Sequence, residues 1–395
     1  MQRTVRVLLR PNSEQASALT ATAQQFTAAF NTVCAYGWER REKNGVTLHH
    51  QTYRMLKAKF PALVSDLHIQ ARVKATEAVK SAFLRQRQKR PVSCPRSQAC
   101  APRYNVHTFR LDWEARTVRL STTVGRLLLD FRLPAYASRY TGGKPCTADL
   151  VERRGRWWLH VVVEIEAPVV SPTDKVVGVD LGLAQPAVTS HGRFLGKRGW
   201  RGIEARTFRL RRALQKKGSK SAKHHLCKLR DKQRRFRRDC DHVLSKQIVQ
   251  SIPEGGTAVL ENLKDIRRRL ETRHGAQSRR LHSWSFAQLR SFITYKAEER
   301  GVTVAGVDPR HTSQQCSRCG HTARNNRRSR AFFVCRACGF SLHADLNGAR
   351  NIAAKYRANL GNAGAGGPSV NRPIVGADEF AHHTTYKPPA LAGGR

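Results

Sequence analysis

The stretch that decides the fold is residues 175–196, KVVGVDLGLAQPAVTSHGRFLG. It predicts three strands in succession, with a turn at His191-Gly192. The first strand, VVGVD, is apolar until it closes with Asp180. Such strands are buried on both faces, and an acid within one is costly unless it lies at the end and meets a cation. Asp180 is therefore expected at the end of a buried strand.

Two further acids occupy comparable positions downstream. Glu261 closes the apolar stretch AVLE, and Asp345 opens the helical stretch that continues as LNGARNIAAKY. Between them, residues 284–301 predict a helix and residues 302–309 a strand. Two carboxylates that end strands and one that begins a helix, on a sheet that starts with three hairpin strands, are typical of a ribonuclease-H-like α/β fold.

In that fold the acids converge on divalent metal. Two ions about 4 Å apart activate water and stabilise the leaving oxygen of a phosphodiester. Oxygen ligands suit Mg²⁺ or Mn²⁺, and the helix N-terminus helps to keep Asp345 ionised. We therefore predict that Asp180, Glu261 and Asp345 are catalytic residues that bind two such ions.

Each acid also has a purely structural interpretation. Asp180 caps the turn after its strand, Glu261 pairs with one of many nearby arginines, or Asp345 is an ordinary helix N-cap, the commoner role for a lone aspartate before a helix. Asp308 also ends a strand, but the proline after it favours a turn. The joint occurrence of three acids favours the metal hypothesis.

Four of the ten cysteines are grouped. Cys316 and Cys319 form one CxxC pair, Cys335 and Cys338 form a second, and fifteen residues separate the pairs. This spacing predicts a tetrahedral four-thiolate site for one structural Zn²⁺, without the open position that a catalytic zinc needs. Disulfides are the weaker alternative, because a chain with no signal-peptide core is expected in a reducing compartment.

Composition indicates the partner. The 395 residues carry 72 Lys plus Arg against 28 Asp plus Glu, a formal charge of +44. No acidic block offsets this charge, so a long nucleic acid is expected ahead of a membrane. The longest apolar run, near WWLHVVV, is too short to span a bilayer. We therefore expect a cytoplasmic, nucleoid-associated protein.

The order of these motifs resembles that of the TnpB family of bacterial insertion sequences, relatives of the compact type V CRISPR nucleases. The resemblance is carried by GVDLGL, LENL, VDPRHTSQQCSRCGH, CRACGF and HADLNGARNIA, within residues 175–355. It implies an RNA-guided DNA endonuclease with a RuvC-type triad, a guide RNA, a double-stranded DNA target and an association with a transposable element. A monomer is expected.

The resemblance also implies a multidomain α+β organisation. A wedge-like β-barrel with an inserted helical recognition domain would precede a ribonuclease-H-like (RuvC) domain that contains a zinc ribbon. The expected ranges are 1–12 and 101–170 for the barrel, 13–100 for the helical domain, 171–310 and 341–358 for the nuclease domain, 311–340 for the ribbon and 359–395 for a disordered tail.

Arginines outside the triad are candidate contacts to nucleic acid. Residues 199–250 carry 17 Lys or Arg and four acids, which predicts a helical pair with a basic outer face. The loop after Glu261 has the place of a lid, or is a disordered basic loop. The candidates are Arg234, Arg235, Arg267, Arg268, Arg269, Arg324, Arg327, Arg328 and Arg330.

Other functions stay open at this point. A compact type V CRISPR effector would share these motifs, since neighbouring DNA alone separates the two. An unguided transposase or junction resolvase would use the same fold and acids without RNA. A binder or repressor without catalysis would be marked by the loss of an acid, and all three acids are present.

Overall fold

The computed structural model describes residues 1–182, 185–197, 199–263, 286–329 and 331–362. The chain divides into two compact units, residues 1–166 and 167–395. The boundary lies close to the predicted one at residue 170. Each unit contains its own apolar core. Among the described residues, none of the helices is both long and apolar enough to cross a bilayer.

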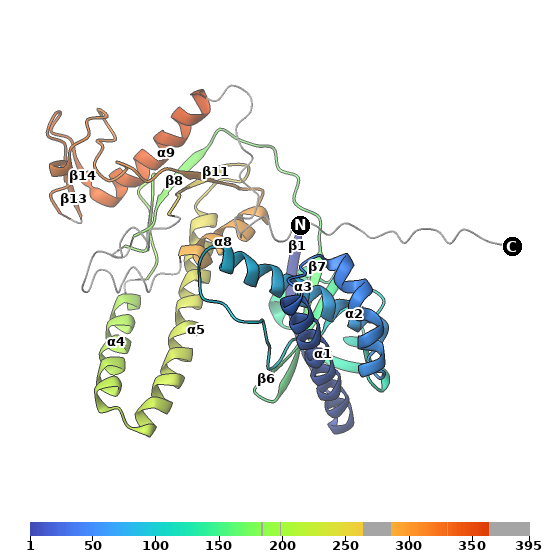
Figure 1. Ribbon diagram of the computed structural model, residues 1–395. Coiled ribbons are helices and arrows are strands. Elements are labelled where there is room, and N and C mark those ends of the chain that lie inside the picture. The colour runs from blue at the N-terminus through green and yellow to red at the C-terminus, as the bar shows by residue number, and fades with distance from the viewer. Residues whose placement is uncertain (183–184, 198, 264–285, 330, 363–395) are drawn as a thin grey trace. The chain divides into compact units, whose positions relative to one another are not determined.

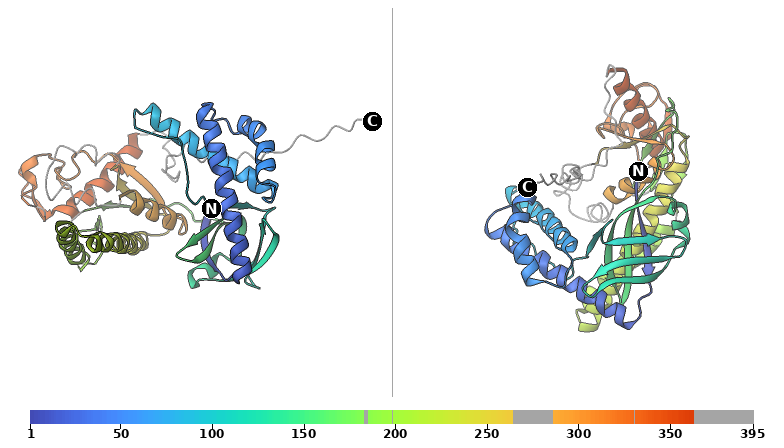
Figure 2. Two further views of the ribbon diagram at one scale, coloured as in Figure 1. Left: turned by 60° about the horizontal axis from the view of Figure 1, so that its bottom comes forward. Right: turned by 90° about the vertical axis from the view of Figure 1, so that its right-hand side faces the viewer.

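The first unit combines a sheet with three helices. Its seven-stranded sheet has the order β2-β6-β7-β1-β5-β4-β3, and Figure 2 shows the strands curling towards a barrel. The opening strand lies between β7 and β5, as predicted, because its alternate valines and leucines face the core. The strands are β1 Gln2–Leu9, β2 Arg103–Asn105, β3 Phe109–Asp112, β4 Thr117–Thr122, β5 Gly125–Arg132, β6 Lys144–Arg153 and β7 Arg156–Glu164.

The helices of this unit are inserted between β1 and β2, in agreement with the predicted order. They are α1 Ser13–Glu39, α2 Gly45–Lys59 and α3 Ser65–Arg87. The predicted capping box is present, since the Gln15 amide donates to Asn12 Oδ1 at 2.8 Å and the Asn12 amide to Gln15 Oε1 at 3.0 Å. The sequence reasoning missed α2, whose signal was the N-cap Asn44.

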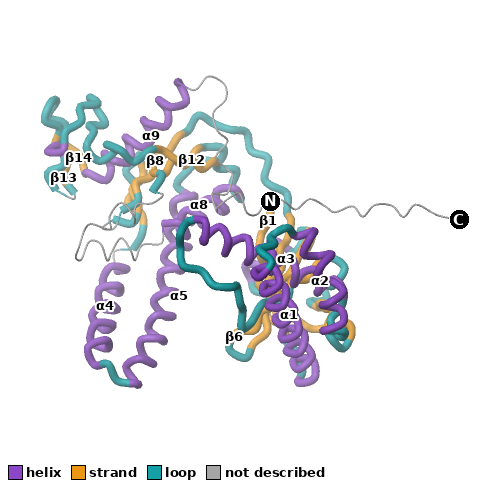
Figure 3. Tube along the Cα trace, in the orientation of Figure 1, coloured by secondary structure: helices purple, strands orange, loops and turns teal. Residues whose placement is uncertain are grey.

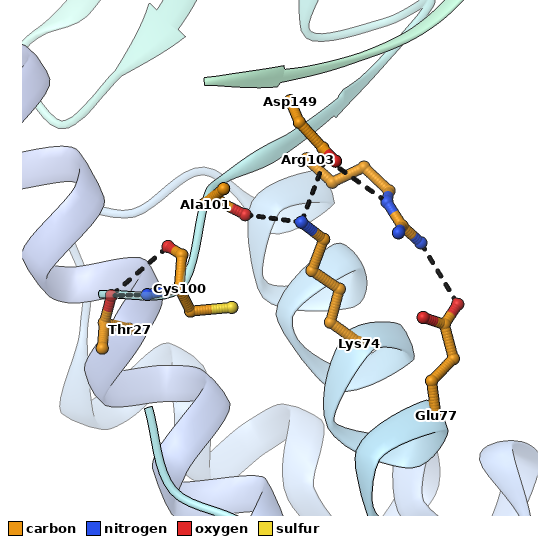
Figure 4. A network of polar contacts seen from close by, with 7 residues as sticks. All are labelled: Thr27, Lys74, Glu77, Cys100, Ala101, Arg103 and Asp149. Atoms are coloured by element: carbon orange, nitrogen blue, oxygen red, sulfur yellow. Dashed lines mark hydrogen bonds and ion pairs between the residues drawn. The ribbon is translucent and has the colours of Figure 1, made fainter. Parts of the chain in front are cut away.

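A polar network fastens the helices to the sheet (Figure 4). Lys74 of α3 lies 3.0 Å from Asp149 of β6 and donates to the Ala101 carbonyl at 2.7 Å. Arg103 of β2 bridges Asp149 and Glu77, at 3.5 and 3.2 Å. These ion pairs are partly exposed, so they fix the register between the two layers more than they stabilise the fold.

The second unit is a three-layer α/β structure. Its sheet has the order β10-β9-β8-β11-β12, in which β8, β11 and β12 are parallel and β9 and β10 form an antiparallel meander with β8. This confirms the three hairpin strands predicted from residues 175–196. The strands are β8 Val176–Asp180, β9 Ala187–Thr189, β10 Phe194–Leu195, β11 Thr257–Glu261 and β12 Thr303–Val307.

Helices cover both faces of this sheet (Figure 1). Val177 and Val179 face a core built with α5 and α8, whereas Val176 lies in the core under α9. A strand covered on both faces has no exposed side, which explains why VVGV is continuously apolar. The helices are α4 Gly199–Lys217, α5 Lys220–Gln250, α8 Phe286–Glu298 and α9 Ala344–Asn362.

Two of the predicted boundaries are wrong. The ribbon hairpin consists of β13 Phe332–Val334 and β14 Ser341–His343, so it extends past residue 340 because β14 supplies the partner strand. Helix α9 continues to Asn362, so residues 359–362 are helical and do not belong to a disordered tail. The rest of the predicted tail lies outside the described residues.

Candidate active site

Two of the three predicted acids lie next to each other at one edge of the sheet. In the parallel pair β8–β11, Val179 is in register with Leu260, so the next residues along the two strands are Asp180 and Glu261. Neighbouring strands are about 4.8 Å apart, and residues in register point to the same face. The carboxyl ends of β8 and β11 therefore hold both carboxylates side by side.

Helix α9 brings the third acid to this edge. Asp345 lies in its first turn, and the helix packs directly on β8. A β-carbon at Gly178 would come within 2.1 Å of the Ala349 carbonyl oxygen, so the glycine allows the two backbones to touch. Gly178 and Asp180 point to the same face, since side chains two apart along a strand do so. The close approach at Gly178 thus sets Asp180 under the N-terminal half of α9.

Asp180 is close enough to Glu261 and Asp345 for both carboxylates to act on its pKa. Burial, followed by the Glu261 and Asp345 carboxylates, raises the pKa of the Asp180 carboxyl from an ordinary 3.8 to about 8, although Arg327 opposes the rise. Burial also raises the pKa of Glu261, although the Thr312 hydroxyl, Lys355 and Arg327 act in the other direction. Like charges gathered in a poorly solvated place favour protons or divalent ions.

Arg327 supplies a cation at the carboxylates. Its guanidinium donates to Asp345 Oδ1 at 3.0 Å, and the Asp345 side chain is 16% exposed. Arg327 was predicted as a nucleic-acid contact of the ribbon, but its side chain lies against the catalytic candidate instead of along an outer surface. Its charge offsets part of the repulsion among the three acids.

Thr312 orients Glu261. The Thr312 side chain is buried, and its Oγ1 lies 2.6 Å from Glu261 Oε1. A hydroxyl donated to a ligating carboxylate fixes that carboxylate and tunes its basicity. Sequence reasoning missed Thr312, although it lies in the quoted stretch VDPRHTSQQCSRCGH, because the contact joins segments 51 positions apart.

A ladder of buried side chains on α9 holds the segment that contains Thr312. The Asn351 amide donates to the carbonyls of Thr312 and Gln315, at 2.8 and 2.7 Å. Asn347 donates to the Gln315 carbonyl at 2.8 Å and accepts from the Ser317 amide at 3.0 Å. These asparagines are four residues apart and so share one face of the helix. They connect α9 to the start of the cysteine module, by which we mean the segment that contains both CxxC pairs and the β13–β14 hairpin.

The four predicted cysteines form one cluster. Among the described residues they are the only set of three or more metal-binding side chains whose ligand atoms all lie within 4.8 Å of one another. Cys316 and Cys338 have their sulfurs 3.8 Å apart, and Cys319 and Cys335 have theirs 3.5 Å apart. Tetrahedral zinc with bonds of about 2.3 Å requires sulfur separations of about 3.8 Å. The cluster therefore has the geometry to hold a zinc ion.

The local backbone supports this geometry. Gly320 and Gly339, which follow the two pairs, have φ angles of 78° and 70°, as expected for knuckles. Their amides donate to the carbonyls of Cys316 and Cys335, at 2.9 and 3.1 Å. Figure 3 shows the module as mostly loop, with the short strands β13 and β14 leading into α9.

Among the described residues, the three carboxylates do not form a compact ligand cluster like that of the four cysteines. Two ions about 4 Å apart would bridge them. Oxygen ligands of this kind suit Mg²⁺ or Mn²⁺. The donor set is thus compatible with hard divalent cations.

The predicted arginines fall into three groups. Arg327 lies at the carboxylates. Arg234 and Arg235 are exposed on α5, and Arg324 and Arg328 are exposed on the cysteine module, as a nucleic-acid contact requires. The other four, together with the basic loop after Glu261, lie outside the described residues: Arg267, Arg268, Arg269 and Arg330.

Known proteins share parts of this sequence and this fold. The family model for the Cas12f1-like TNB domain matches residues 286–352, which run from α8 into α9. A solved structure of a Cas12f1–sgRNA–target DNA complex shares the fold, with a TM-score of 0.60 at 16% identity over 87% of this chain and 83% of that one.

Curated relatives are similar in sequence. The Cas12f1 endodeoxyribonuclease of Sulfoacidibacillus thermotolerans is 34% identical over 51% of this chain and 51% of its own. InsQ of Escherichia coli (strain K12), whose name proposes RNA-guided DNA endonuclease activity, is 29% identical over 56% and 60%. A TnpB-like protein of Aquifex aeolicus is 28% identical over 37% and 46%. The alignments thus span about half of each relative. With the family-model match, they show that the chain is similar to Cas12f1 and TnpB-like proteins.

Proposed function

We propose that the protein is an endonuclease that hydrolyses DNA phosphodiesters under the direction of a guide RNA. The observation that carries the proposal is the meeting of Asp180, Glu261 and Asp345, in which the two neighbouring carboxylates raise the pKa of Asp180. Three acids from distant parts of the chain, gathered in a poorly solvated place, have a role beyond capping or surface pairing.

The three acids would each have a part in binding metal. Asp180 and Glu261 project from adjacent strand ends and would share the bound cations, while Asp345 closes the site from α9. Mg²⁺ or Mn²⁺ bound there would activate the attacking water and stabilise the leaving oxygen. Thr312 holds Glu261 in orientation, and the guanidinium of Arg327 is suited to a phosphate oxygen.

The cysteine module would contribute structure. We infer that it binds one Zn²⁺ through Cys316, Cys319, Cys335 and Cys338, with four sulfurs and no open position. Because Asn347 and Asn351 join the module to α9, zinc would stabilise the segment that carries Thr312 and the helix that carries Asp345.

The surface charge supports nucleic-acid partners. A guide RNA and its DNA heteroduplex need a long basic channel that reads backbone shape, and α4 and α5 expose cations suited to it. The Cas12f1 structure with a similar fold is a complex with sgRNA and target DNA. We infer the same partners here, a monomeric state, a location at the bacterial nucleoid and an origin in a transposable element.

One experiment separates this proposal from its alternatives. The RNA that co-purifies with the full chain is sequenced, and the particle is assayed for DNA cleavage before and after RNase treatment. A discrete transcript with a defined end and RNase-sensitive cleavage support guided cleavage. RNase-resistant cleavage of a defined DNA structure would favour an unguided transposase or resolvase, and the genes beside the coding sequence separate a transposon protein from a CRISPR effector.

A control variant tests the site itself. Asp180→Ala is expected to abolish cleavage and to leave RNA binding nearly unchanged. Cleavage by Asp180→Ala at the rate of the unaltered protein would show that the assignment of the three acids is wrong.

A further inference from the structure

Three aromatic rings lie beside the carboxylates and have no part in the proposed hydrolysis. They are Phe194 of β10, Phe332 of β13 and His343 of β14. Phe194 is 46% exposed and Phe332 is 53% exposed. Large apolar side chains that gather in the open near a polar site often mark a surface that binds something. We call these three residues the aromatic shelf.

The rings come from two separate sheets that are joined at His343. Phe332 pairs directly with His343 in the antiparallel hairpin, and opposite residues in such a pair share one face with their β-carbons about 5 Å apart. The rings of Phe194 and His343 have centroids 4.8 Å apart and meet edge to face at 88°. His343 therefore links the two phenylalanines into one row.

The shelf adjoins the site. Asp180 is in register with Val188, and Val188 with Phe194, so Phe194 points to the same face as Asp180, two strands away. Two strand spacings amount to about 10 Å. At the other end, His343 Nδ1 accepts a hydrogen bond of 3.3 Å from the Asp345 amide. The row thus begins next to Asp345. Its distance from the carboxylates is comparable to the length of one or two nucleotides of a strand.

The exposure of Phe332 is a local exception. The next residue, Phe333, is fully buried among Cys316, Cys335 and Ala344 and supplies the apolar core of the cysteine module. That core is complete without Phe332. A polar residue at position 332 would suit the exposed face of a two-stranded hairpin, so packing among the described residues does not explain the phenylalanine.

The surroundings identify the occupant by its chemistry. Arg193 and Arg328, which are close in sequence to the phenylalanines, are exposed, and the chain carries +44 overall. A partner must therefore offer flat apolar faces together with negative charge, next to a site suited to phosphodiesters. A single-stranded nucleic acid has this combination, because its bases stack on aromatic rings while its phosphates meet cations.

We propose that the aromatic shelf stacks one or two bases of the DNA strand that is being cut, beside the scissile phosphate. The inference rests on the proposed nuclease function and adds to it a positioning surface for the unpaired substrate strand. Stacking at this distance holds the strand in register, so that one phosphate reaches the carboxylates. Because every base has a π face, the shelf accepts any sequence.

Photocrosslinking tests the proposal without need of a guide or of cleavage. A short single-stranded DNA in which iodouracil replaces thymine is bound to the full chain with Ca²⁺ in place of Mg²⁺. The complex is irradiated, and the crosslinked peptides are identified by mass spectrometry. We expect crosslinks at Phe194, Phe332 or His343. Crosslinks that map only elsewhere, for example to Phe208 of α4, overturn the proposal.

Variants then separate stacking from general binding. Phe194→Ala and Phe332→Ala should each lower the crosslink yield at the shelf by about tenfold, in keeping with the contribution of a stacked base. Phe194→Trp should keep the yield and Phe194→Leu should not. Phe208→Ala is the matched control, since Phe208 is 42% exposed on the same unit. Equal loss in the control would show general binding and refute the shelf.

The outcome is independent of the nuclease assignment. Crosslinks at the shelf in a protein that never cleaves DNA would refute the proposed function and leave the shelf intact. Cleavage that requires Asp180, together with Phe194→Ala and Phe332→Ala variants that crosslink as the unaltered protein does, would support the proposed function and refute the aromatic shelf.

Discussion

The carboxylate of Asp180 lies directly against the backbone of Gly348 in α9. A β-carbon at position 348 would be 2.9 Å from Asp180 Oδ2, closer than a carbon and a carboxylate oxygen tolerate. The missing side chain of one helix residue thus makes room for the strand-end acid. The same helix places Asp345 one turn earlier, so Gly348 helps to bring the first and third acids together.

The first prediction concerns this contact. Gly348→Ala should keep the fold, because the clashing atom is the mobile end of a side chain, but should displace the Asp180 carboxylate. We expect a loss of DNA cleavage of about tenfold or more, since small misplacements of catalytic groups are costly. Circular dichroism and a cleavage assay measure the two effects.

Two other glycines provide the comparison. Gly202→Ala on α4, where nothing lies within 4 Å of the added carbon, should cleave normally and be slightly more stable. Gly178→Ala would force backbone atoms apart and should lower the melting temperature sharply. Full cleavage by Gly348→Ala would show that the close approach has no catalytic consequence.

The second prediction concerns pH and metal-free stability. The pKa of Asp180 is about 8 in the folded chain against an ordinary 3.8, so between these values the folded state holds a proton that the unfolded state has lost. The free energy of unfolding should therefore fall as pH rises from about 4 to about 8, by a few kcal/mol at most. Asp180→Asn, which stays neutral, should remove this fall.

Thermal melts in EDTA check the sign. Asp180→Asn should melt with the unaltered protein at about pH 4 and above it at pH 9, by roughly 2 °C or more. Added Mg²⁺ should reverse the order at pH 9, because only the unaltered site binds it. Equal changes of melting temperature with pH in the two proteins would mean that the pKa of Asp180 is not raised in the folded chain.

The third prediction concerns Thr312. Thr312→Val keeps the shape of the side chain and removes the hydroxyl that lies 2.6 Å from Glu261 Oε1. Loss of such a supporting hydrogen bond should weaken Mn²⁺ binding by about 10- to 100-fold. Thr312→Ser keeps the hydroxyl and should restore most of the affinity. Calorimetric titration with Mn²⁺ measures the difference, and equal affinities of the Val and Ser variants would contradict it.

The fourth prediction concerns Arg327. Its guanidinium pairs with Asp345 and competes with divalent cations for the same charge. Arg327→Gln should therefore bind Mn²⁺ more tightly at pH 9, by about tenfold for one unit charge removed at close range, and yet cleave more slowly, because the cation suited to the phosphate is gone. Arg324→Gln, exposed on the same module, is the control and should change neither quantity. Weaker Mn²⁺ binding by Arg327→Gln would refute the competition.

The fifth prediction concerns the cysteine module. Elemental analysis should find one zinc per chain, and Cys335→Ser should lose it. Because structural zinc contributes folding free energy directly, this variant should melt earlier in the second unit while the transition of the first unit stays in place. Cys227→Ser, an exposed cysteine of α5, should behave as the unaltered protein. Full zinc content in Cys335→Ser would remove Cys335 from the ligand set.

Much of the fold could be read from local pattern. The apolar VVGVD and AVLE stretches indicated buried strands, and the structure has β8 and β11 there. The capping pair Asn12 and Gln15 indicated the start of α1, and the spacing of the cysteines indicated a four-sulfur cluster. These signals depend on neighbours within a few residues. Helix α2 was missed although its buried residues Leu48, Thr52 and Leu56 are spaced four apart, as on one face of a helix.

The contacts that complete the candidate site could not be read in this way. The roles of Gly178 and Gly348 depend on how closely α9 approaches β8. Thr312 reaches Glu261 across 51 positions and Arg327 reaches Asp345 across 18. Arg327 was predicted to lie on an outer surface. The sequence shows that its side chain is charged, but it does not show in which direction the side chain points.

By itself, the sequence determined which chemical groups are available: three acids at element ends, four cysteines at metal spacing and a large excess of cations. The tertiary structure alone decided which of them meet. Residue type and short-range periodicity are local properties, whereas the pKa of Asp180, the pairing of Arg327 and the row of three rings arise when separate elements pack, exclude water and bring charges within a few ångströms.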